Sequence, residues 1–194
     1  MAYITTVPES QADGLVQELY KTAQENMGYI PNYLKTFSLR PEVYEAWTKL
    51  LSAFRSHMRL RRYELVTFAT ALELDCTYCL LAHAKVLRKN FFTAEQLIAM
   101  TTDFKSAGLS DEEVALMAFA QKITRRASDV SDEDVEALRG FGLKDDEILN
   151  VVLTCTARNF FSKTLDALDA RPDETYLELE PELIQSLTLG RTFP

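Results

Sequence analysis

Apolar residues recur along the chain at the spacing of amphipathic helices. Residues 11–27, for example, place Leu15, Val16, Leu19 and Tyr20 on one helical face. No segment shows the strict apolar–polar alternation that is typical of a half-buried strand. The pattern therefore predicts an all-α protein, with helices over residues 11–27, 31–37, 43–57, 61–74, 76–89, 145–168 and 181–187.

Capping signals predict three further helix starts. In a capping box, an N-cap hydroxyl faces an acid or amide three residues later. This spacing occurs at Thr93 with Gln96, Ser110 with Glu113 and Ser131 with Asp134. In the same way, the acidic Asp75 is expected to cap the helix that begins at Cys76.

Residues 61–74 are apolar on almost every side of the predicted helix, which places this helix in the core. The chain has 194 residues, a length that suits one domain. We therefore expect a single domain over residues 1–194, with its functional core at about residues 41–125.

Composition and charge exclude several classes of protein. The formal net charge is −8, and an acidic surface repels nucleic acid. No apolar run approaches the roughly 20 residues that cross a bilayer. The N-terminus lacks the basic and then apolar layout of a signal peptide, so we expect a cytoplasmic protein without membrane association.

The chain has three cysteines, which is a small and odd number and does not suit a disulfide framework. Cys155 lies in the apolar stretch 151–155 and is interpreted as a small buried hydrophobic residue. The other two form the pair Cys76-Thr77-Tyr78-Cys79, which is followed by His83. In a reducing compartment, such a pair is more often catalytic or metal-binding than structural.

Helical spacing brings His83 near both sulfur atoms. Cys79 lies four residues before His83, and Cys76 seven residues before it, so all three share one face. Both cysteines would lie in the first helical turn, where free N–H groups and the helix dipole favour a thiolate. We therefore expect both thiol pKa values to lie below about 8.5.

A carboxylate on the preceding helix could orient this histidine. Glu64 lies twelve residues before Cys76, in an otherwise apolar helix. If the two helices pack antiparallel, Glu64 reaches the face that carries His83. A carboxylate–imidazole–thiol relay follows from that arrangement.

The pattern Glu64-x11-Cys76-x2-Cys79-x3-His83 resembles the AhpD-like alkylhydroperoxidases of the carboxymuconolactone decarboxylase superfamily. The phrases around it resemble the peroxidase-related branch. These phrases are Ile30-Pro31-Asn32-Tyr33, Leu39-Arg40-Pro41-Glu42-Val43, residues 130–135 and Asn159-Phe160-Phe161. The resemblance implies a fold of antiparallel helices around the Cys-x-x-Cys helix, and a homo-oligomer.

The resemblance also implies a thiol-dependent peroxidase without a metal, haem or other cofactor. Cys79 would attack a hydroperoxide, and Cys76 would then close a disulfide. His83 would serve as the base on Cys79, tuned by Glu64. A dithiol, such as a lipoylated partner protein, would reduce the disulfide. Some members have a histidine where this chain has Tyr78, which is no base near neutral pH.

Other interpretations of the same residues stay open at this stage. The cysteines could be core residues or, with His83, three ligands of a zinc ion. Glu64 could be an exposed helix acid, and His57 is interpreted as a surface residue. Phe91, Phe92, Phe160 and Phe161 are interpreted as core or subunit interface. The functional alternatives are a lactone decarboxylase-like enzyme and a non-enzymatic redox sensor.

Overall fold

The computed structural model describes residues 2–193, and its regular structure over that range is entirely helical. This confirms the prediction of an all-α protein. The α-helices are α1 (Gly14–Met27), α2 (Asn32–Thr36), α3 (Pro41–Arg55), α4 (Leu60–Glu73), α5 (Thr77–Asn90), α6 (Ala94–Asp103), α7 (Asp111–Arg126), α8 (Asp132–Gly140), α9 (Asp145–Ala167) and α10 (Pro181–Leu187). The 3-10 helices are η1 (Glu9–Gln11), η2 (Phe37–Leu39), η3 (Phe104–Ser106), η4 (Ala127–Asp129) and η5 (Glu174–Glu178).

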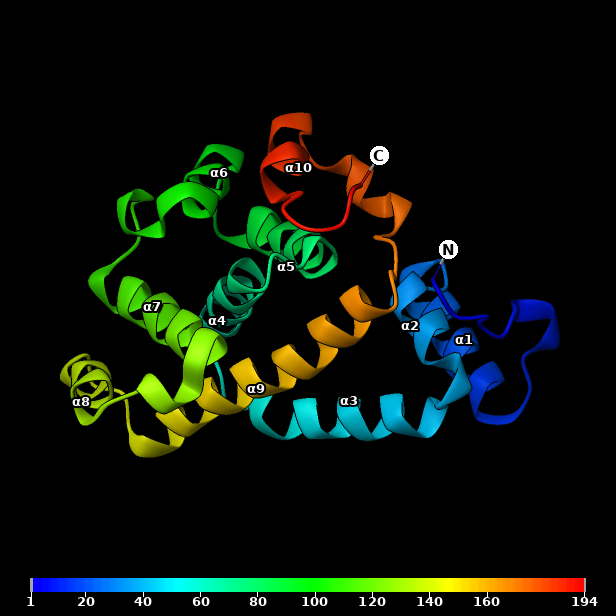
Figure 1. Cartoon of the computed structure of the whole chain (residues 1–194), viewed down its shortest axis with the longest axis horizontal. Coiled ribbons are helices and arrows are strands. Elements are labelled where there is room, and N and C mark those ends of the chain that lie inside the picture. Colours follow the sequence, from blue (N-terminus) through cyan, green and yellow to red (C-terminus); the bar gives the residue numbers. More distant parts are fainter. Residues whose placement is uncertain (1, 194) are drawn as a thin grey trace.

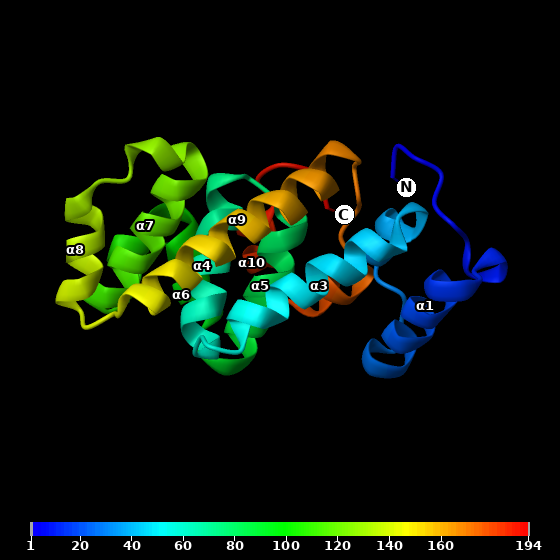
Figure 2. The same ribbon diagram turned by 90° about the horizontal axis from the view of Figure 1, so that it is seen from below.

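The helices form an elongated arrangement with α4 and α5 near its middle. Helices α1 and α2 lie at one end, and α7 and α8 lie at the other (Figures 1 and 2). The long helix α9 runs past α3, α4 and α7 and contacts all three. Helices α4 and α5 pack against each other as a hairpin joined by residues 74–76.

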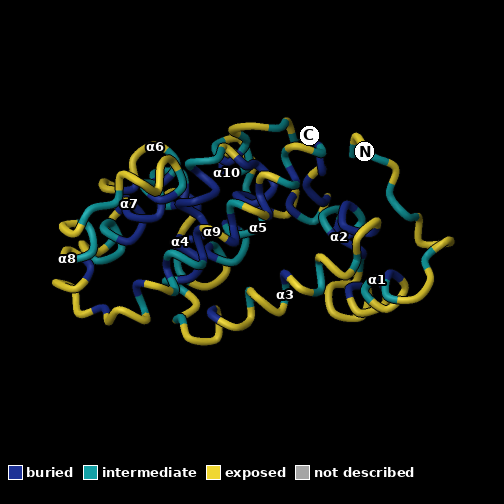
Figure 3. The backbone as a smooth tube through the Cα atoms, turned by 60° about the horizontal axis from the view of Figure 1, so that its bottom comes forward, coloured by how far each residue is buried: buried dark blue, intermediate teal, exposed yellow. Residues whose placement is uncertain are grey.

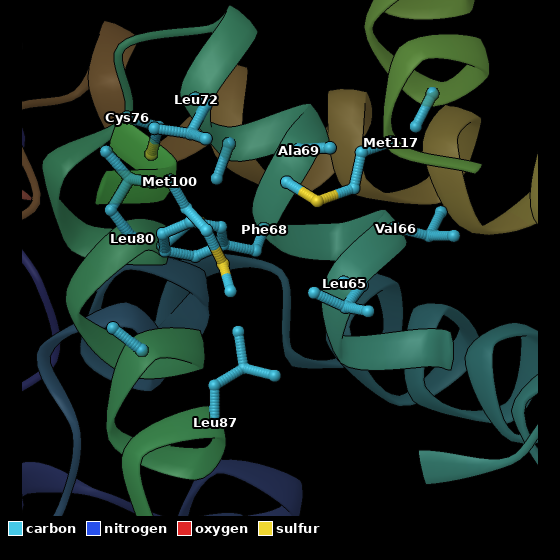
Figure 4. Close-up of a cluster of buried hydrophobic side chains, with 14 of the residues drawn as sticks. Leu65, Val66, Phe68, Ala69, Leu72, Cys76, Leu80, Leu87, Met100 and Met117 are labelled. Atoms are coloured by element: carbon cyan, nitrogen blue, oxygen red, sulfur yellow. The ribbon is translucent and has the colours of Figure 1, made fainter. Parts of the chain in front are cut away.

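Helix α4 is the core helix that its sequence predicts. Residues 63–72 are all buried, so this helix is enclosed on every side. Figure 3 shows buried backbone around α4 and α5, with exposed backbone along α3 and at α1. Phe68 of α4, Leu80 of α5 and Met100 of α6 belong to one apolar cluster that also contains Cys76 (Figure 4).

Predicted and observed helix ends differ by a few residues. The first helix begins at Gly14, because Asp13 is still extended, and the third ends at Arg55. Gln96 and Glu113 each complete a reciprocal capping box with Thr93 and Ser110. At the third start, the Asp134 carboxylate accepts a hydrogen bond from the backbone N–H of Ser131 at 2.8 Å.

The prediction that Asp75 caps α5 is wrong. Cys76 occupies the N-cap position, and Asp75 lies one residue earlier with φ 52° in the tight turn after α4. Asp is among the few residues that tolerate this left-handed conformation. The turn is closed by the N–H groups of Asp75 and Cys76, which donate to the carbonyls of Leu72 and Ala71. Carbonyls at the end of a helix lack partners within it, and these two hydrogen bonds satisfy them at the end of α4.

The C-terminal segment covers the start of α5. Helix α10 contacts α5 and α6, and η5 contacts α5. The backbone N–H of Gly190 donates to Thr77 Oγ1 at 3.1 Å. A side chain at position 190 would overlap the carbonyl oxygen of Asp75. The C-terminal segment therefore packs directly against the turn that contains Cys76.

Among residues 2–193, no helix is both long enough and apolar enough to cross a membrane. The single-domain boundaries and the cytoplasmic location stay predictions.

Candidate active site

The structure brings the four predicted site residues together between α4 and α5. Cys76 and Cys79 begin α5, His83 follows one turn later, and Glu64 faces them from α4. Glu64, Cys79 and His83 line a cleft of about 1270 Å³. Cys76 is completely buried at the start of the helix. Cys79 is also almost fully buried, at 1 % exposed, but it lines the cleft and Cys76 does not, so a molecule in the cleft lies next to Cys79.

Glu64 and His83 form a direct hydrogen-bonded pair. His83 Nδ1 lies 2.6 Å from Glu64 Oε2, and Glu64 is 2 % exposed, so its interpretation as an exposed acid is wrong. Burial lowers the pKa of His83, and Glu64 offsets only part of this effect. The imidazole is therefore neutral near pH 7. When Nδ1 donates to the carboxylate, Nε2 is the basic nitrogen.

The two thiols have opposite pKa shifts. The pKa of Cys79 is lowered to about 7, first by a hydrogen bond from Cys76 and then by Arg158 and Ser162. Ser162 Oγ donates to Cys79 Sγ at 3.1 Å. The pKa of Cys76 is raised, because this thiol donates to Cys79 and is buried. The expectation of two lowered values is therefore wrong for Cys76, since a single thiolate is stabilised by the other thiol.

Arg158 is a site residue that the sequence interpretation missed. It lies on α9 with 5 % of its surface exposed, and its Nη2 donates to the Tyr63 hydroxyl at 3.0 Å. Its guanidinium lies over the rings of Trp47 and Phe161, at 5.6 and 5.5 Å from their centroids. This buried positive charge favours the thiolate form of Cys79.

Helical spacing in the sequence could have indicated that Arg158 and Ser162 are buried polar residues. Both follow Cys155 at the i+3 and i+7 positions of the predicted last helix, so they share its buried face. Polar residues on a buried helical face need partners, and for Ser162 that partner is the sulfur of Cys79.

Tyr78 both packs and lines the cleft. Its hydroxyl donates to the carboxylate of Asp173 and accepts from the backbone N–H of Tyr33 at 3.2 Å. Asp173 also accepts from the backbone N–H of Asn32 at 2.8 Å. Burial raises the pKa of Tyr78 far above its usual range, so it supplies no base. It instead ties α2 and the segment after α9 to the start of α5.

The imidazole and the sulfurs are not directly hydrogen bonded within residues 2–193. His83 bonds Glu64, Cys79 accepts from the Ser162 hydroxyl, and the Cys76 thiol donates to the backbone carbonyl of Ser162. Cys79 and His83 share the wall of one cleft, so a molecule in that cleft can lie between them.

The other sequence interpretations can be compared with the described residues. Among them, no group of three or more His, Cys, Asp or Glu side chains is arranged to hold a metal ion, so the zinc alternative gains no support. Cys155 is fully buried, and burial raises its pKa to about 12, as expected for an inert thiol. His57 is exposed. Phe92 and Phe161 are buried, and Phe161 also lines the cleft.

Replacing Arg158 with glutamine is expected to raise the pKa of Cys79 by at least about one pH unit, because an adjacent positive charge is lost. Alkylation of Cys79 by iodoacetamide, followed by peptide mass spectrometry, reports the thiolate fraction. In the unchanged protein the rate should fall as the pH drops below about 7. Arg158→Lys should restore part of the shift, and Arg125→Gln, exposed on α7, should leave the profile unchanged. An unaltered profile in Arg158→Gln would contradict the role of this charge.

Comparisons with known proteins agree with this geometry. Residues 41–122 match the carboxymuconolactone decarboxylase family. A peroxidase-related protein with an alkylhydroperoxidase AhpD core, from Ralstonia eutropha JMP134, superimposes with a TM-score of 0.83 at 19 % identity, covering 92 % of this chain and 95 % of that one. A peroxidase-related protein from Silicibacter sp. TM1040 gives 0.78 at 23 % identity, with coverages of 90 % and 93 %.

A third solved structure is the debrominase Bmp8 in complex with 2,3,4-tribromopyrrole. It has a TM-score of 0.75 at 13 % identity and covers 95 % of this chain and 96 % of its own. No curated protein sequence matches the chain significantly.

The chain therefore has the AhpD-like helical fold, with Cys-x-x-Cys at the turn of a helical hairpin and a buried Glu–His pair across it. Residues 41–122 thus match the carboxymuconolactone decarboxylase family, which the sequence motif resembles, and the chain as a whole shares the fold of solved proteins with an AhpD core.

Proposed function

We propose that this protein is a thiol-dependent peroxidase that reduces organic hydroperoxides or hydrogen peroxide. The observation that carries the proposal is the asymmetry of the two thiols. Cys79 lines the cleft with a pKa lowered to about 7, and Cys76, which does not line the cleft, has a raised pKa. This asymmetry suits a nucleophile with a second thiol held in reserve.

The reaction proceeds in two steps on the protein. The Cys79 thiolate attacks the distal oxygen of the hydroperoxide, the O–O bond breaks, and the alkoxide leaves as an alcohol after taking a proton. The product on the protein is the sulfenic acid of Cys79. The sulfur of Cys76 then attacks this group, an S–S bond forms, and hydroxide leaves as water.

His83 handles the protons of the first step. Its neutral imidazole, held by Glu64, takes the proton of the Cys79 thiol through a water molecule or the substrate in the cleft. The same nitrogen can return that proton to the departing alkoxide. The hydrogen bond from Ser162 and the positive charge of Arg158 stabilise the deprotonated thiolate of Cys79.

A dithiol completes the cycle by thiol–disulfide exchange, and a lipoylated partner protein is the proposed reductant. The net reaction converts one hydroperoxide and one dithiol into an alcohol, water and a disulfide. The proposal includes a homo-oligomeric assembly, as the family resemblance implies.

The deciding experiment is hydroperoxide consumption with dithiothreitol or dihydrolipoamide as the reductant. Wild-type protein should consume many equivalents, and a Cys76→Ser/Cys79→Ser double variant should consume none above background. Cys155→Ala is the matched control, because its thiol is buried away from the cleft. No cysteine-dependent consumption by the wild type would exclude the peroxidase. Oxidation of the thiols without repeated turnover would favour the redox sensor.

Reductive dehalogenation is a second candidate function, favoured by the aromatic wall of the cleft. Tyr33, Tyr44, Trp47 and Phe161 line it beside Cys79. Flat rings of this kind can stack on a halogenated ring, and the debrominase Bmp8 shares the fold. Bromide release from 2,3,4-tribromopyrrole in the presence of dithiothreitol, without hydroperoxide consumption, would favour this function over the first.

A further inference from the structure

The wall of the cleft is positively charged, although the whole chain carries a net charge of −8. Four basic side chains line it, namely Arg55, Lys85, Lys89 and Arg158. The one acidic residue in the wall is Glu64, whose carboxyl is already hydrogen bonded to His83. The local charge of the cleft therefore opposes that of the protein.

Two of the basic side chains stand at the exposed part of the cleft without an ion-pair partner among the described residues. Arg55 lies with its guanidinium 5.0 Å from the centroid of the Tyr63 ring, and Lys89 is exposed near the end of α5. Lys85 differs, because Glu178 pairs with it at 2.8 Å. At the exposed part of the cleft, Arg55 and Lys89 can therefore each form an ion pair with an anionic ligand.

Arg158 supplies a third positive charge deeper in the cleft. Its Nη2 bonds the Tyr63 hydroxyl, but its Nε is buried with no hydrogen-bond partner. No carboxylate of residues 2–193 forms an ion pair with it. Burying a guanidinium destabilises the protein when its charge is unpaired and one of its N–H groups lacks an acceptor, unless an anion supplies both. The Cys79 thiolate is one such anion, and a ligand is another.

Aromatic rings occupy the wall between these charges. Trp47 stacks on Phe161 with centroids 4.3 Å apart, and Tyr33 and Tyr44 lie stacked at 6.0 Å. The cleft volume of about 1270 Å³ exceeds the roughly 300–1000 Å³ of sites for drug-sized ligands. It is far larger than hydrogen peroxide or a small alkyl hydroperoxide requires.

We propose that the cleft selects an aromatic organic hydroperoxide that carries a carboxylate. The rings of the substrate pack on the aromatic wall, its peroxide group meets Cys79, and its carboxylate pairs with Arg55 and Lys89. The peroxide part of this assignment rests on the proposed function, whereas the selection of an aromatic anion rests on the cleft itself.

A binding experiment tests the anion separately from catalysis. Trp47 is the single tryptophan of the chain and lines the cleft, so its fluorescence reports occupancy. We expect reduced protein to bind 4-isopropylbenzoate about tenfold more tightly than the neutral 4-isopropylbenzamide, as charge-assisted contacts allow. Lys89→Gln and Arg55→Gln should each reduce this ratio, and added salt should reduce it further.

The matched control is Lys105→Gln, an exposed lysine outside the cleft, which should keep the wild-type ratio. Equal affinity for the acid and the amide would overturn the proposal, as would a ratio that Arg55→Gln and Lys89→Gln leave unchanged.

Turnover tests the substrate assignment. The kcat/KM for 4-carboxycumene hydroperoxide should exceed that for cumene hydroperoxide by about tenfold, and Lys89→Gln should lower this ratio. Tight benzoate binding without a preference in turnover would overturn the assignment of the substrate. Failure of both hydroperoxides to react would instead reject the peroxidase itself, while the affinity ratio would still decide the anion site.

Discussion

Replacing Cys79 with serine is expected to abolish hydroperoxide consumption. A serine hydroxyl is not ionised near neutral pH and cannot form a sulfenic acid, so the first chemical step is lost. The remaining thiol cannot substitute, because Cys76 does not line the cleft and its pKa is raised. The loss should be complete within the detection limit of a coupled assay with dihydrolipoamide.

Replacing Cys76 with serine should have a different kinetic signature. Cys79 keeps its contact with Ser162 and its neighbour Arg158, so it should still react once with the hydroperoxide. Without Cys76 no internal disulfide forms, so with no external thiol present consumption should stop after one equivalent per chain and leave a sulfenic acid in place of the disulfide. Trapping with dimedone and intact-mass measurement should show a sulfenic acid on Cys79. Full turnover by Cys76→Ser, or a trapped adduct on Cys76 in Cys79→Ser, would contradict the assigned order of the thiols.

Replacing His83 with glutamine is expected to lower kcat/KM by about 10²- to 10⁴-fold near pH 7, the range typical of a lost general base. Glutamine keeps the polarity and much of the volume of the side chain but cannot accept a proton. Cys79 should then depend on solvent to lose its proton. The dependence of kcat/KM on pH should therefore follow the ionisation of Cys79 alone and shift to higher pH in this variant.

Glu64→Gln separates the orientation of the imidazole from its charge. The amide oxygen can still accept from His83 Nδ1, but the negative charge that favours the imidazolium is gone. Without that charge the imidazole is a weaker base, so kcat/KM should fall by about tenfold, the lower end of the range for an outer partner of this kind. Circular dichroism and urea unfolding check that the buried substitution leaves the fold intact. For the preceding prediction, a His83→Gln variant that keeps the wild-type kcat/KM would show that His83 is not the base.

Much of this site can be predicted from local sequence because its chemistry lies on one helical hairpin. Cys76, Cys79 and His83 share a face through helical periodicity, and Glu64 reaches that face because α4 and α5 are consecutive and joined by a short turn. The continuous apolar character of residues 63–72 likewise predicts a buried helix, whatever packs around it. Periodicity and short loops constrain contacts between residues that are close in sequence.

Contacts over long sequence separations cannot be predicted in this way. Ser162 and Arg158 reach Cys79 from α9, about eighty residues away along the chain, and Asp173 reaches Tyr78 from beyond the end of α9. These residues give the two thiols different environments. A helix N-terminus alone would favour both thiolates, so the local argument could not predict that only one is favoured.

The sequence by itself therefore determined the helical class, the buried central helix, the dithiol and its Glu64–His83 pair. The tertiary structure alone decided which sulfur faces the cleft, which thiol has the lowered pKa, and which charges and rings surround the cleft. The physical reason is the difference between interactions that are local in sequence and interactions between distant segments. Helical periodicity acts within a few turns of one segment, whereas burial and electrostatic environment depend on every segment that packs around a side chain.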